Sequence, residues 1–303
     1  RHDPFPLMDM QQAYWVGRTG ALVLGNVSCH VYLELETDDL DLSRWEACWN
    51  RLIRRHDMLR CVIMEDGRQR ILPEVPPFTV TVQDATGLDA RAAERMVLEC
   101  RERMGHEVLS AKEWPLFRVA ATRMPGGSIR LHISLDLLVA DLHSMNLMMS
   151  GLESLYRHPE LEPAPLGLSF RDYVLALEAF RKGPRYRKDK EYWLERVAAL
   201  PPAPDLPLAL PPAQVERPRF VRHAAQLDRK TWAALRQKAA AHELTVSGLL
   251  LACYAEVLAR WSSRDEFTLN VTLFNRLPLH PEVGDIVGDF TSCLLYTSDA
   301  ADD

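Results

Sequence analysis

The chain has 303 residues, 47% of them hydrophobic and 26% charged, values that suit a globular protein with a sizeable buried core. Its 36 basic and 42 acidic side chains give a formal net charge of −6, which argues against a nucleic-acid-binding surface. We expect neither a membrane span, because no segment has ~18 consecutive apolar residues, nor a secretory signal. The length suits two lobes of about 150 residues each.

The cysteines are widely and irregularly spaced, and none belongs to a CxxC pair. They are Cys29, Cys48, Cys61, Cys100, Cys253 and Cys293. Four lie in apolar stretches that are expected in the core. This usage predicts free thiols in a reducing cytoplasm and gives no support for a metal site.

Hydrophobic periodicity predicts alternating strands and helices in the first half of the chain. In chain order these are an amphipathic opening segment (5–18), a strand (28–36), a helix (42–56), a hairpin (59–64 and 69–72), a strand (77–83), a helix (89–104), two strands (116–123 and 128–136) and a helix (142–156). Asp41 can cap the helix that starts near residue 42, and Trp45 and Trp49 should face inward.

The second half continues the pattern after a proline-rich connection. We predict helical segments in 169–199, an extended linker in 200–218, a strand near 220–227, helices over 229–242 and 247–261, and a strand over 266–274. The mixture indicates an α/β fold. We expect an N-terminal lobe at 1–170, a helical and proline-rich connection at 171–219 and a partial C-terminal lobe at 220–292.

The sharpest local signal is the run LHISLDLLVADLHS at residues 131–144. Asp136 ends a strand, Asp141 precedes a helix, and the four residues after Asp136 are apolar, so both carboxylates are expected to be at least partly buried. A buried carboxylate can act in proton transfer. The alternatives remain open: Asp141 can cap the helix or pair with an arginine, and both can be well-bonded core residues.

Other polar residues give weaker evidence of a functional site. His143 and His56 have no Ser/Asp partner pattern and are interpreted as surface or packing residues. No phosphate-binding glycine loop or GxSxG motif is present.

Six motifs, in the same order along the chain, resemble those of one protein family. Asp136, Asp141 and Ser144 resemble the DxxxxDxxS core of heterocyclisation domains of nonribosomal peptide synthetases, at the place where ordinary condensation domains carry HHxxxDG. The other five are similar to FPLTxxQxAYxxGR (Phe5–Arg18, with Met8 departing), RHxML followed by GxQ (Arg55–Leu59, Gly67, Gln69), LPxxPxLPL (Leu200–Leu208), LxxW (Leu258–Trp261) and VGDFTS (Val287–Ser292).

The resemblance implies a chloramphenicol-acetyltransferase-like fold of two lobes. It implies an enzyme, an acyltransferase and cyclodehydratase, with Asp136 and Asp141 catalytic and Ser144 and Arg276 supporting. The substrates would be an acyl or peptidyl thioester and a Cys, Ser or Thr thioester on phosphopantetheine arms. Partners would be upstream and downstream peptidyl carrier domains and an adjacent adenylation domain; no bound cofactor, metal, nucleic acid or membrane is expected.

The end of the chain departs from the family. Two later motifs, whose Thr and Asp are thought to serve cyclodehydration, do not follow residue 292, and residues 293–303 resemble translated adapter sequence. We therefore expect a non-native tail there and an incomplete second lobe. The start at Arg1 fits an internal piece of a longer protein.

Two other functions are open. One is an ordinary amide-forming condensation domain or acyltransferase of the same fold, which would carry His at positions 136 and 137, where this chain has Asp136 and Leu137. The other is a catalytically silent interaction module. The sequence does not identify the ring heteroatom, the donor acyl group or the product.

A buried Asp141 needs a partner, because an unpaired buried charge is costly. Arg276, at the end of the strand 266–274, is predicted to pair with it from the second lobe, as related condensation domains do. Arg60 is the rival partner from the first lobe.

Overall fold

The computed structural model describes residues 1–216, 218–221 and 223–299, with side chains described as far as Cys293. By their contacts the residues divide into two units. Unit 1 comprises Arg1–Gly183 and Phe274–Ser292, and unit 2 comprises Pro184–Leu273 together with the chain from Cys293. The sequence pattern places 274–292 in the second lobe, whereas these residues pack with unit 1.

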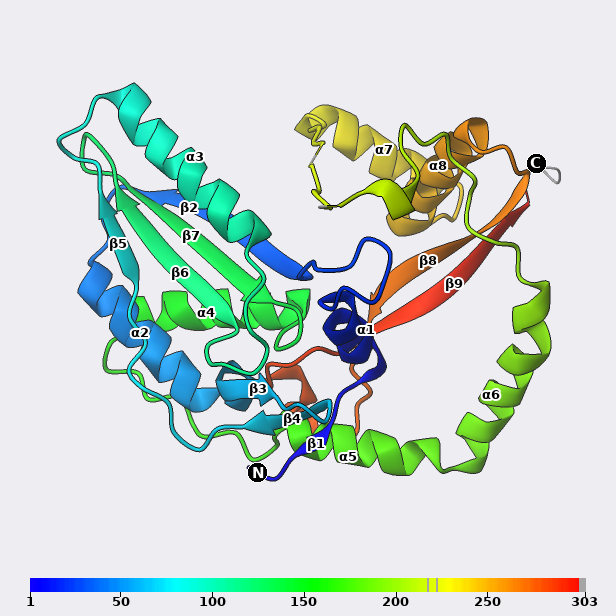
Figure 1. Ribbon diagram of the computed structural model, residues 1–303, viewed down its shortest axis with the longest axis horizontal. Helices are drawn as coiled ribbons and strands as arrows, with labels where there is room; N and C mark the ends of the chain where they lie inside the picture. The colour runs from blue at the N-terminus through cyan, green and yellow to red at the C-terminus, as the bar shows by residue number, and fades with distance from the viewer. Residues whose placement is uncertain (217, 222, 300–303) are drawn as a thin grey trace. The chain divides into compact units, whose positions relative to one another are not determined.

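The predicted alternation of strands and helices is confirmed, and Figure 1 labels each element. The strands are β1 (Phe5–Pro6), β2 (His30–Thr37), β3 (Cys61–Ile63), β4 (Arg68–Ile71), β5 (Thr81–Asp84), β6 (Phe117–Arg123), β7 (Ile129–Asp136), β8 (Glu266–Phe274) and β9 (Thr291–Asp299). The α-helices are α1 (Asp9–Gly17), α2 (Leu42–Arg55), α3 (Ala90–His106), α4 (Leu142–Arg157), α5 (Phe170–Arg181), α6 (Pro184–Arg196), α7 (Arg229–Ala241) and α8 (Val246–Trp261).

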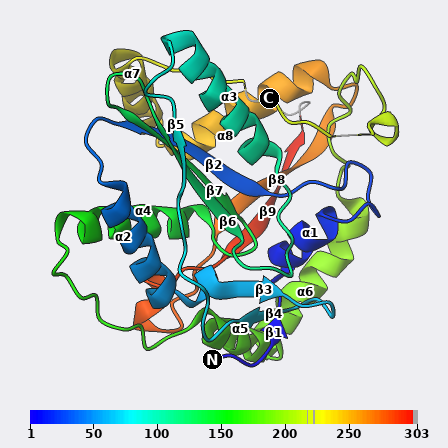
Figure 2. The same cartoon turned by 60° about the vertical axis from the view of Figure 1, so that its left-hand side comes forward.

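The main sheet of unit 1 has the strand order β2-β7-β6-β5. The β2–β7 and β6–β7 pairs are antiparallel and the β5–β6 pair is parallel, so the sheet is mixed. Helix α3 covers one face, while α2 and α4 cover the other (Figures 1 and 2). In the register His30 lies opposite Asp136, so β2 reaches the end of β7 where the predicted site begins.

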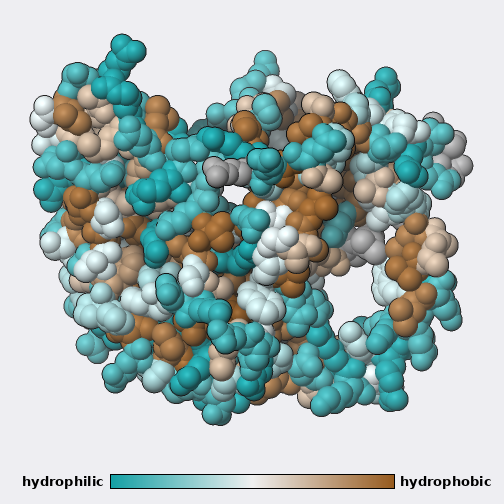
Figure 3. Space-filling model, viewed as in Figure 1, coloured by the Kyte–Doolittle hydropathy of each residue, from teal (hydrophilic) through white to brown (hydrophobic). Residues whose placement is uncertain are grey.

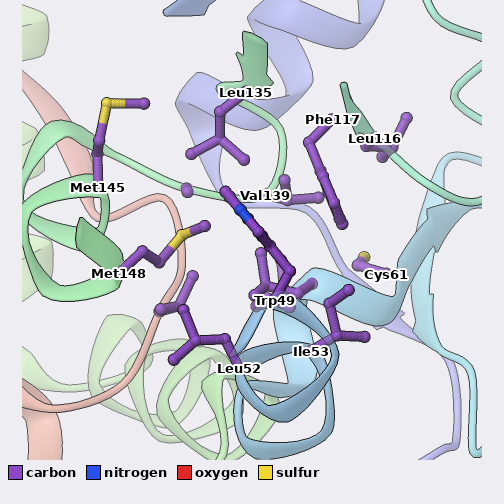
Figure 4. Close-up of a cluster of buried hydrophobic side chains, with 14 of the residues drawn as sticks. Trp49, Leu52, Ile53, Cys61, Leu116, Phe117, Leu135, Val139, Met145 and Met148 are labelled. Carbon is purple, nitrogen blue, oxygen red and sulfur yellow. The ribbon is translucent and has the colours of Figure 1, made fainter. Parts of the chain in front are cut away.

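Helix α2 forms where the sequence predicts it because Asp41 accepts hydrogen bonds from the backbone N–H groups of Ser43 and Arg44. Its inward face carries Trp45 and Trp49 into the core, as predicted. The Trp49 ring stacks on Phe117 of β6 with the ring centroids 5.7 Å apart. Figure 4 shows Trp49 between residues of α4 and of the sheet, so one aromatic side chain joins three elements of the core.

A smaller sheet, ordered β1-β4-β3, closes the other end of unit 1. The predicted hairpin is β3 and β4, paired antiparallel with Cys61 opposite Ile71. Gly67 in its turn has φ of +77°, a left-handed conformation that favours glycine. The strand β1 places Phe5 opposite Gln69, which brings the opening segment of the chain against the hairpin.

Unit 2 contains α6, α7, α8 and most of the two-stranded sheet of β8 and β9. Asp228 caps α7. The proline-rich segment accepts hydrogen bonds from Thr268 of β8 through the carbonyls of Pro201 and Pro202. The strand predicted near 220–227 is wrong for the described residues, which form no ladder. A strand needs a neighbouring backbone to complete its hydrogen bonds, and none of the described residues in this range is paired with another strand.

Several apolar side chains of unit 2 lie on its surface. The apolar side chains of α8 are largely exposed, including Tyr254 and Trp261. Helix α6 has no buried residue, and apolar side chains gather at its C-terminal end (Figure 3).

Three cysteines, Cys48, Cys61 and Cys100, are buried and three are exposed, one fewer in the core than expected. Within the described residues, no three His, Cys, Asp or Glu side chains are placed to hold a metal ion. No single described helix has the length and apolarity of a membrane span; α7 and α8 reach them only as a pair, bent by 100°. The predicted non-native tail falls partly on residues 300–303, which lie outside the described residues.

Candidate active site

The candidate site lies at the turn between β7 and α4 in unit 1. Asp136 is the last residue of β7, Asp141 precedes α4, and Leu138, Val139 and Ala140 between them are fully buried. Both aspartates expose only 1% of their surface, so the predicted burial is confirmed. A backbone hydrogen bond from Val139 N to Asp136 O closes the turn at 3.1 Å.

Asp141 caps α4. Its Oδ1 accepts a hydrogen bond from the Ser144 backbone N–H at 2.7 Å, which satisfies one of the orphan donors at the helix start. The same Oδ1 accepts from the Arg276 guanidinium at 3.1 Å, and Oδ2 lies 3.4 Å from the Phe290 N–H. The cap and the arginine partner, considered as alternatives, are therefore both present.

Arg276 is held from several sides. One terminal nitrogen donates to the carbonyls of Val283 and Ile286, each at 2.8 Å, and the guanidinium carbon lies 3.8 Å from the centre of the Phe290 ring. Burial lowers the pKa of Arg276, while Asp141 opposes that shift. The predicted pair with Asp141 is confirmed; because Arg276 belongs to unit 1, the pair forms inside this unit instead of crossing between two lobes.

The rival Arg60 is excluded as the partner. Its guanidinium binds Asp57 at 2.8 Å and the carbonyls of Ile53 and Arg54 at the end of α2.

Ser144 joins the segment 287–292 to α4. Its hydroxyl accepts from Arg276 at 2.8 Å and donates to the Gly288 carbonyl at 2.8 Å, while the Gly288 N–H donates back at 3.0 Å. The Asp141 N–H also donates to the Gly288 carbonyl. A Cβ added at Gly288 would lie 2.2 Å from the Phe170 ring, so only glycine allows this close approach.

Asp136 has its own arginine, Arg18, which forms an ion pair with Oδ2. The Ser28 hydroxyl donates to the same oxygen at 2.8 Å, and the Leu138 N–H donates to Oδ1 at 2.9 Å. Burial lowers the pKa of Arg18 to about 10, so the guanidinium remains protonated at neutral pH. Arg18 and Ser28 were not predicted as site residues; the only signal was that Arg18 closes the opening motif.

Two glutamines of the quoted motifs hold the apolar turn. Gln11 donates to the Leu138 carbonyl at 2.6 Å, and Gln69 hydrogen-bonds to Gln11 and to the Pro6 carbonyl. Both side chains are fully buried. The opening motif and the hairpin motif thus converge on the backbone between the two aspartates.

A third buried carboxylate, Asp289, was not predicted as a site residue. It is fully buried, its Oδ1 accepts from the Thr291 N–H at 3.0 Å, and its Oδ2 has no hydrogen-bond partner among the described residues. Burial, with a contribution from the neighbouring charge of Asp141, raises the pKa of Asp289 to about 7. The only signal in the sequence was its place in VGDFTS.

Neither histidine forms a hydrogen bond or an ion pair with Asp136 or Asp141 among the described residues. His143 is exposed, with Nε2 3.3 Å from the Gly284 carbonyl. His56 is buried, and burial lowers its pKa to about 4, which fits a neutral packing residue. Both match their predicted roles.

The arrangement is a frame of two buried ion pairs. Arg18 holds Asp136 and Arg276 holds Asp141, and the hydrogen-bond capacity of both carboxylates is largely met by these contacts. Chemically, such groups fix the geometry of a strand-to-helix turn. The catalytic roles predicted for Asp136 and Asp141 stay predictions.

A sequence model of one family covers nearly the whole chain: the condensation domain matches residues 2–303. The chain belongs to the condensation-domain family. It is 41% identical to the cyclization-docking bidomain of the EpoB nonribosomal peptide synthetase from Sorangium cellulosum, whose crystal structure superposes with a TM-score of 0.91 over 99% of this chain and 60% of that one.

Two curated relatives extend the comparison. The pyochelin synthetase PchE of Pseudomonas aeruginosa is 43% identical over 295 residues, 97% of this chain and 20% of that protein. The phenyloxazoline synthase MbtB of Mycobacterium tuberculosis is 37% identical over 301 residues, 98% of this chain and 21% of that protein. This condensation-family chain therefore spans about a fifth of the length of either synthetase.

Proposed function

We propose that this chain provides the heterocyclisation domain of a nonribosomal peptide synthetase. The domain would join an acyl or peptidyl thioester to the amine of a carrier-bound Cys, Ser or Thr. It would then add the side-chain thiol or hydroxyl to the new amide carbonyl and remove water to give a thiazoline or oxazoline.

One observation carries the proposal: Asp136 and Leu137 stand where an amide-forming condensation domain would have two histidines. The relatives agree with it, since one is a cyclization domain by name and another a phenyloxazoline synthase. The buried pair of Asp136 and Arg18 must repay a large desolvation cost, which favours a role for Asp136 at this site.

The contacts support a positioning role for the two aspartates more directly than proton transfer. Neither carboxylate reaches the surface, and each is engaged by an arginine and a backbone N–H. In the proposed mechanism, Arg18 and Arg276 fix the β7–α4 turn through these carboxylates.

The proposed domain would work with carrier-bound substrates and neighbouring domains. Both substrates would arrive on phosphopantetheine arms, which makes neighbouring carrier domains the working partners and an adjacent adenylation domain the source of the amino acid. No resident cofactor is proposed. A cytoplasmic site of action and a siderophore-type product, as the name pyochelin synthetase suggests for one relative, belong to the same proposal.

The test is a domain exchange. Residues 1–292 replace the matching residues of the EpoB cyclization-docking protein, which supplies the rest of the domain, and the hybrid receives a donor thioester and a cysteinyl carrier. A carrier-bound product that has lost water, by intact mass, supports heterocyclisation. A stable amide without loss of water indicates ordinary condensation, and unchanged substrates from a folded hybrid indicate a silent module.

A further inference from the structure

A second feature of unit 1 lies at the C-terminal end of α2. A cavity of about 670 Å³ is bounded by the last turn of α2, the start of the chain and the connection from α4 to α5. Five arginines line it: Arg1, Arg51, Arg54, Arg55 and Arg60. Figures 1 and 2 both show the α4–α5 connection passing close to that end of α2.

The charge of this cavity is opposite to that of the whole chain. Two carboxylates, Asp57 and Glu162, also line it, which leaves a surplus of three positive charges, whereas the chain carries a net charge of −6. Like charges brought to one concave surface repel one another, and an anion placed between them relieves that repulsion.

The guanidinium groups are held in place by backbone carbonyls. Arg51 donates to Pro159 O at 2.9 Å and also to Leu161 O. Arg55 donates to Ala164 O, and Arg1 donates to Leu166 O at 2.6 Å. Each guanidinium retains further N–H donors, because an arginine has five.

Few carboxylates neutralise these arginines. Asp57 binds Arg60 at 2.8 Å and lies 3.9 Å from Arg1. Within the part of the chain that the structure describes, no carboxylate lies at ion-pair distance from Arg51, Arg54 or Arg55, and the Arg54 side chain donates no hydrogen bond there.

Helix ends often carry basic residues that offset the helix dipole, and this explains part of the cluster. That role is already filled by Arg60, which donates to the terminal carbonyls of Ile53 and Arg54 at 2.8 and 2.9 Å. Backbone carbonyls hold Arg1, Arg51 and Arg55, whereas the Arg54 side chain lines the same cavity with no hydrogen bond or ion pair among the described residues.

We propose that this cavity binds a small anion bearing phosphate groups. Guanidinium forks match phosphate oxygens in geometry and charge, and the cavity has the size of a small-molecule site. A protein partner is less favoured, because stable interfaces bury roughly 800 Å² per partner over a broad face, whereas these arginines converge inside a concavity. The site is separate from the aspartates of the β7–α4 turn and does not depend on the proposed heterocyclisation.

Isothermal titration of the whole chain at fixed ionic strength tests this. The probes are inorganic pyrophosphate, coenzyme A and pantetheine, which has no phosphate. We expect pyrophosphate and coenzyme A to bind and pantetheine not to bind. Tighter binding of coenzyme A identifies a phosphopantetheine-type ligand, and equal binding identifies a free phosphate compound.

The matched variants are Arg54→Gln and Arg91→Gln, which remove the same charge. Arg91 is an exposed residue of α3 outside the cavity. Arg54→Gln should weaken pyrophosphate binding by roughly tenfold, as expected for one charge-assisted hydrogen bond, and Arg91→Gln should leave it unchanged. Arg51→Gln is the second variant, and melting curves verify that each protein is folded.

Three outcomes overturn the proposal. The first is the absence of binding by either phosphate compound to the folded chain. The second is an equal loss of affinity in Arg54→Gln and Arg91→Gln, which would reduce the effect to overall charge. The third is tighter binding of a glutamate-rich peptide than of pyrophosphate, which would assign the arginines to an acidic protein partner.

Discussion

The Arg276 guanidinium lies 3.1 Å from the Asp141 carboxylate, although the two residues are 135 positions apart in the chain. The pair is almost completely buried, with 11% of the Arg276 side chain and none of the Asp141 side chain exposed. It fastens the segment 274–292 to the start of α4, and so makes that segment part of unit 1.

Removing Arg276 should therefore leave a buried carboxylate without its counter-ion. We expect Arg276→Ala to lower the free energy of unfolding by about 3–5 kcal/mol, measured by urea denaturation. The control is Arg91→Ala on the exposed face of α3, which should change stability by less than about 0.5 kcal/mol. Equal stability of Arg276→Ala and the wild type would show that Asp141 does not need this partner.

Substitutions of Asp136 distinguish a catalytic role of this residue from a positioning role. In the EpoB hybrid, loss of an acid/base group would reduce the rate by about 10²–10⁴-fold. If Asp136 acts only through Arg18, Asp136→Asn should also lower the melting temperature, and Arg18→Ala should reproduce both effects. Product formation by a folded Asp136→Ala variant at the wild-type rate would exclude either role.

Gly288 tests the packing of the same segment. A Cβ there would overlap the Phe170 ring, so Gly288→Ala should destabilise the protein by about 1–3 kcal/mol through overpacking. A Cβ added at Gly105, inside α3, would meet nothing within 4 Å, and Gly105→Ala should stabilise the protein by roughly 0.5–1 kcal/mol. Thermal denaturation of both variants measures whether each substitution raises or lowers stability. A Gly288→Ala variant as stable as the wild type would contradict the close packing on Phe170.

The raised pKa of Asp289, about 7, makes stability depend on pH. Between the ordinary aspartate pKa near ~4 and the folded-state pKa, the unfolded chain releases a proton that the folded chain keeps. The contribution of Asp289 to stability should therefore fall as pH rises through this window, by up to about 1.4 kcal/mol per pH unit. The Asp289→Asn variant should be as stable as the wild type below pH ~4 and more stable than the wild type above pH ~7.

His56 provides a control of opposite sign. Its folded-state pKa of about 4 lies below the ordinary value, so its contribution is complete above pH ~6.5 and is lost as pH falls towards 4. Relative to His56→Gln, the wild type should lose stability over that acidic range. Parallel pH profiles for Asp289→Asn and the wild type would contradict the burial of an uncompensated carboxyl group.

Much of unit 1 was predictable because its signals are local. Alternation revealed β2 and β7, and Asp41 followed by an apolar stripe revealed α2. The partner of Asp141 was also predictable, because a buried charge demands a partner and the resemblance to condensation domains pointed to Arg276, with Arg60 as the alternative.

Other features depend on distant parts of the chain that no local pattern encodes. Arg18 meets Asp136 across 118 positions, and the burial of Asp289 results from the packing of a short loop. The prediction of a strand near 220–227 was wrong for a related reason. Residues with a high β-propensity form a strand only where a neighbouring backbone is available. The packing of residues 274–292 with unit 1 follows from the Phe290 ring, which contacts Tyr173 with the centroids 4.7 Å apart.

The fate of the cysteine thiol distinguishes a chain that closes a ring from one that stops at an amide. The EpoB hybrid is given a donor thioester and a cysteinyl carrier, then treated with iodoacetamide, and the carrier-bound product is weighed by mass spectrometry. We expect a dehydrated product that takes up no alkyl group, because the sulfur would lie in a thiazoline. An alkylated product that keeps its water would contradict it and identify an amide-forming condensation domain.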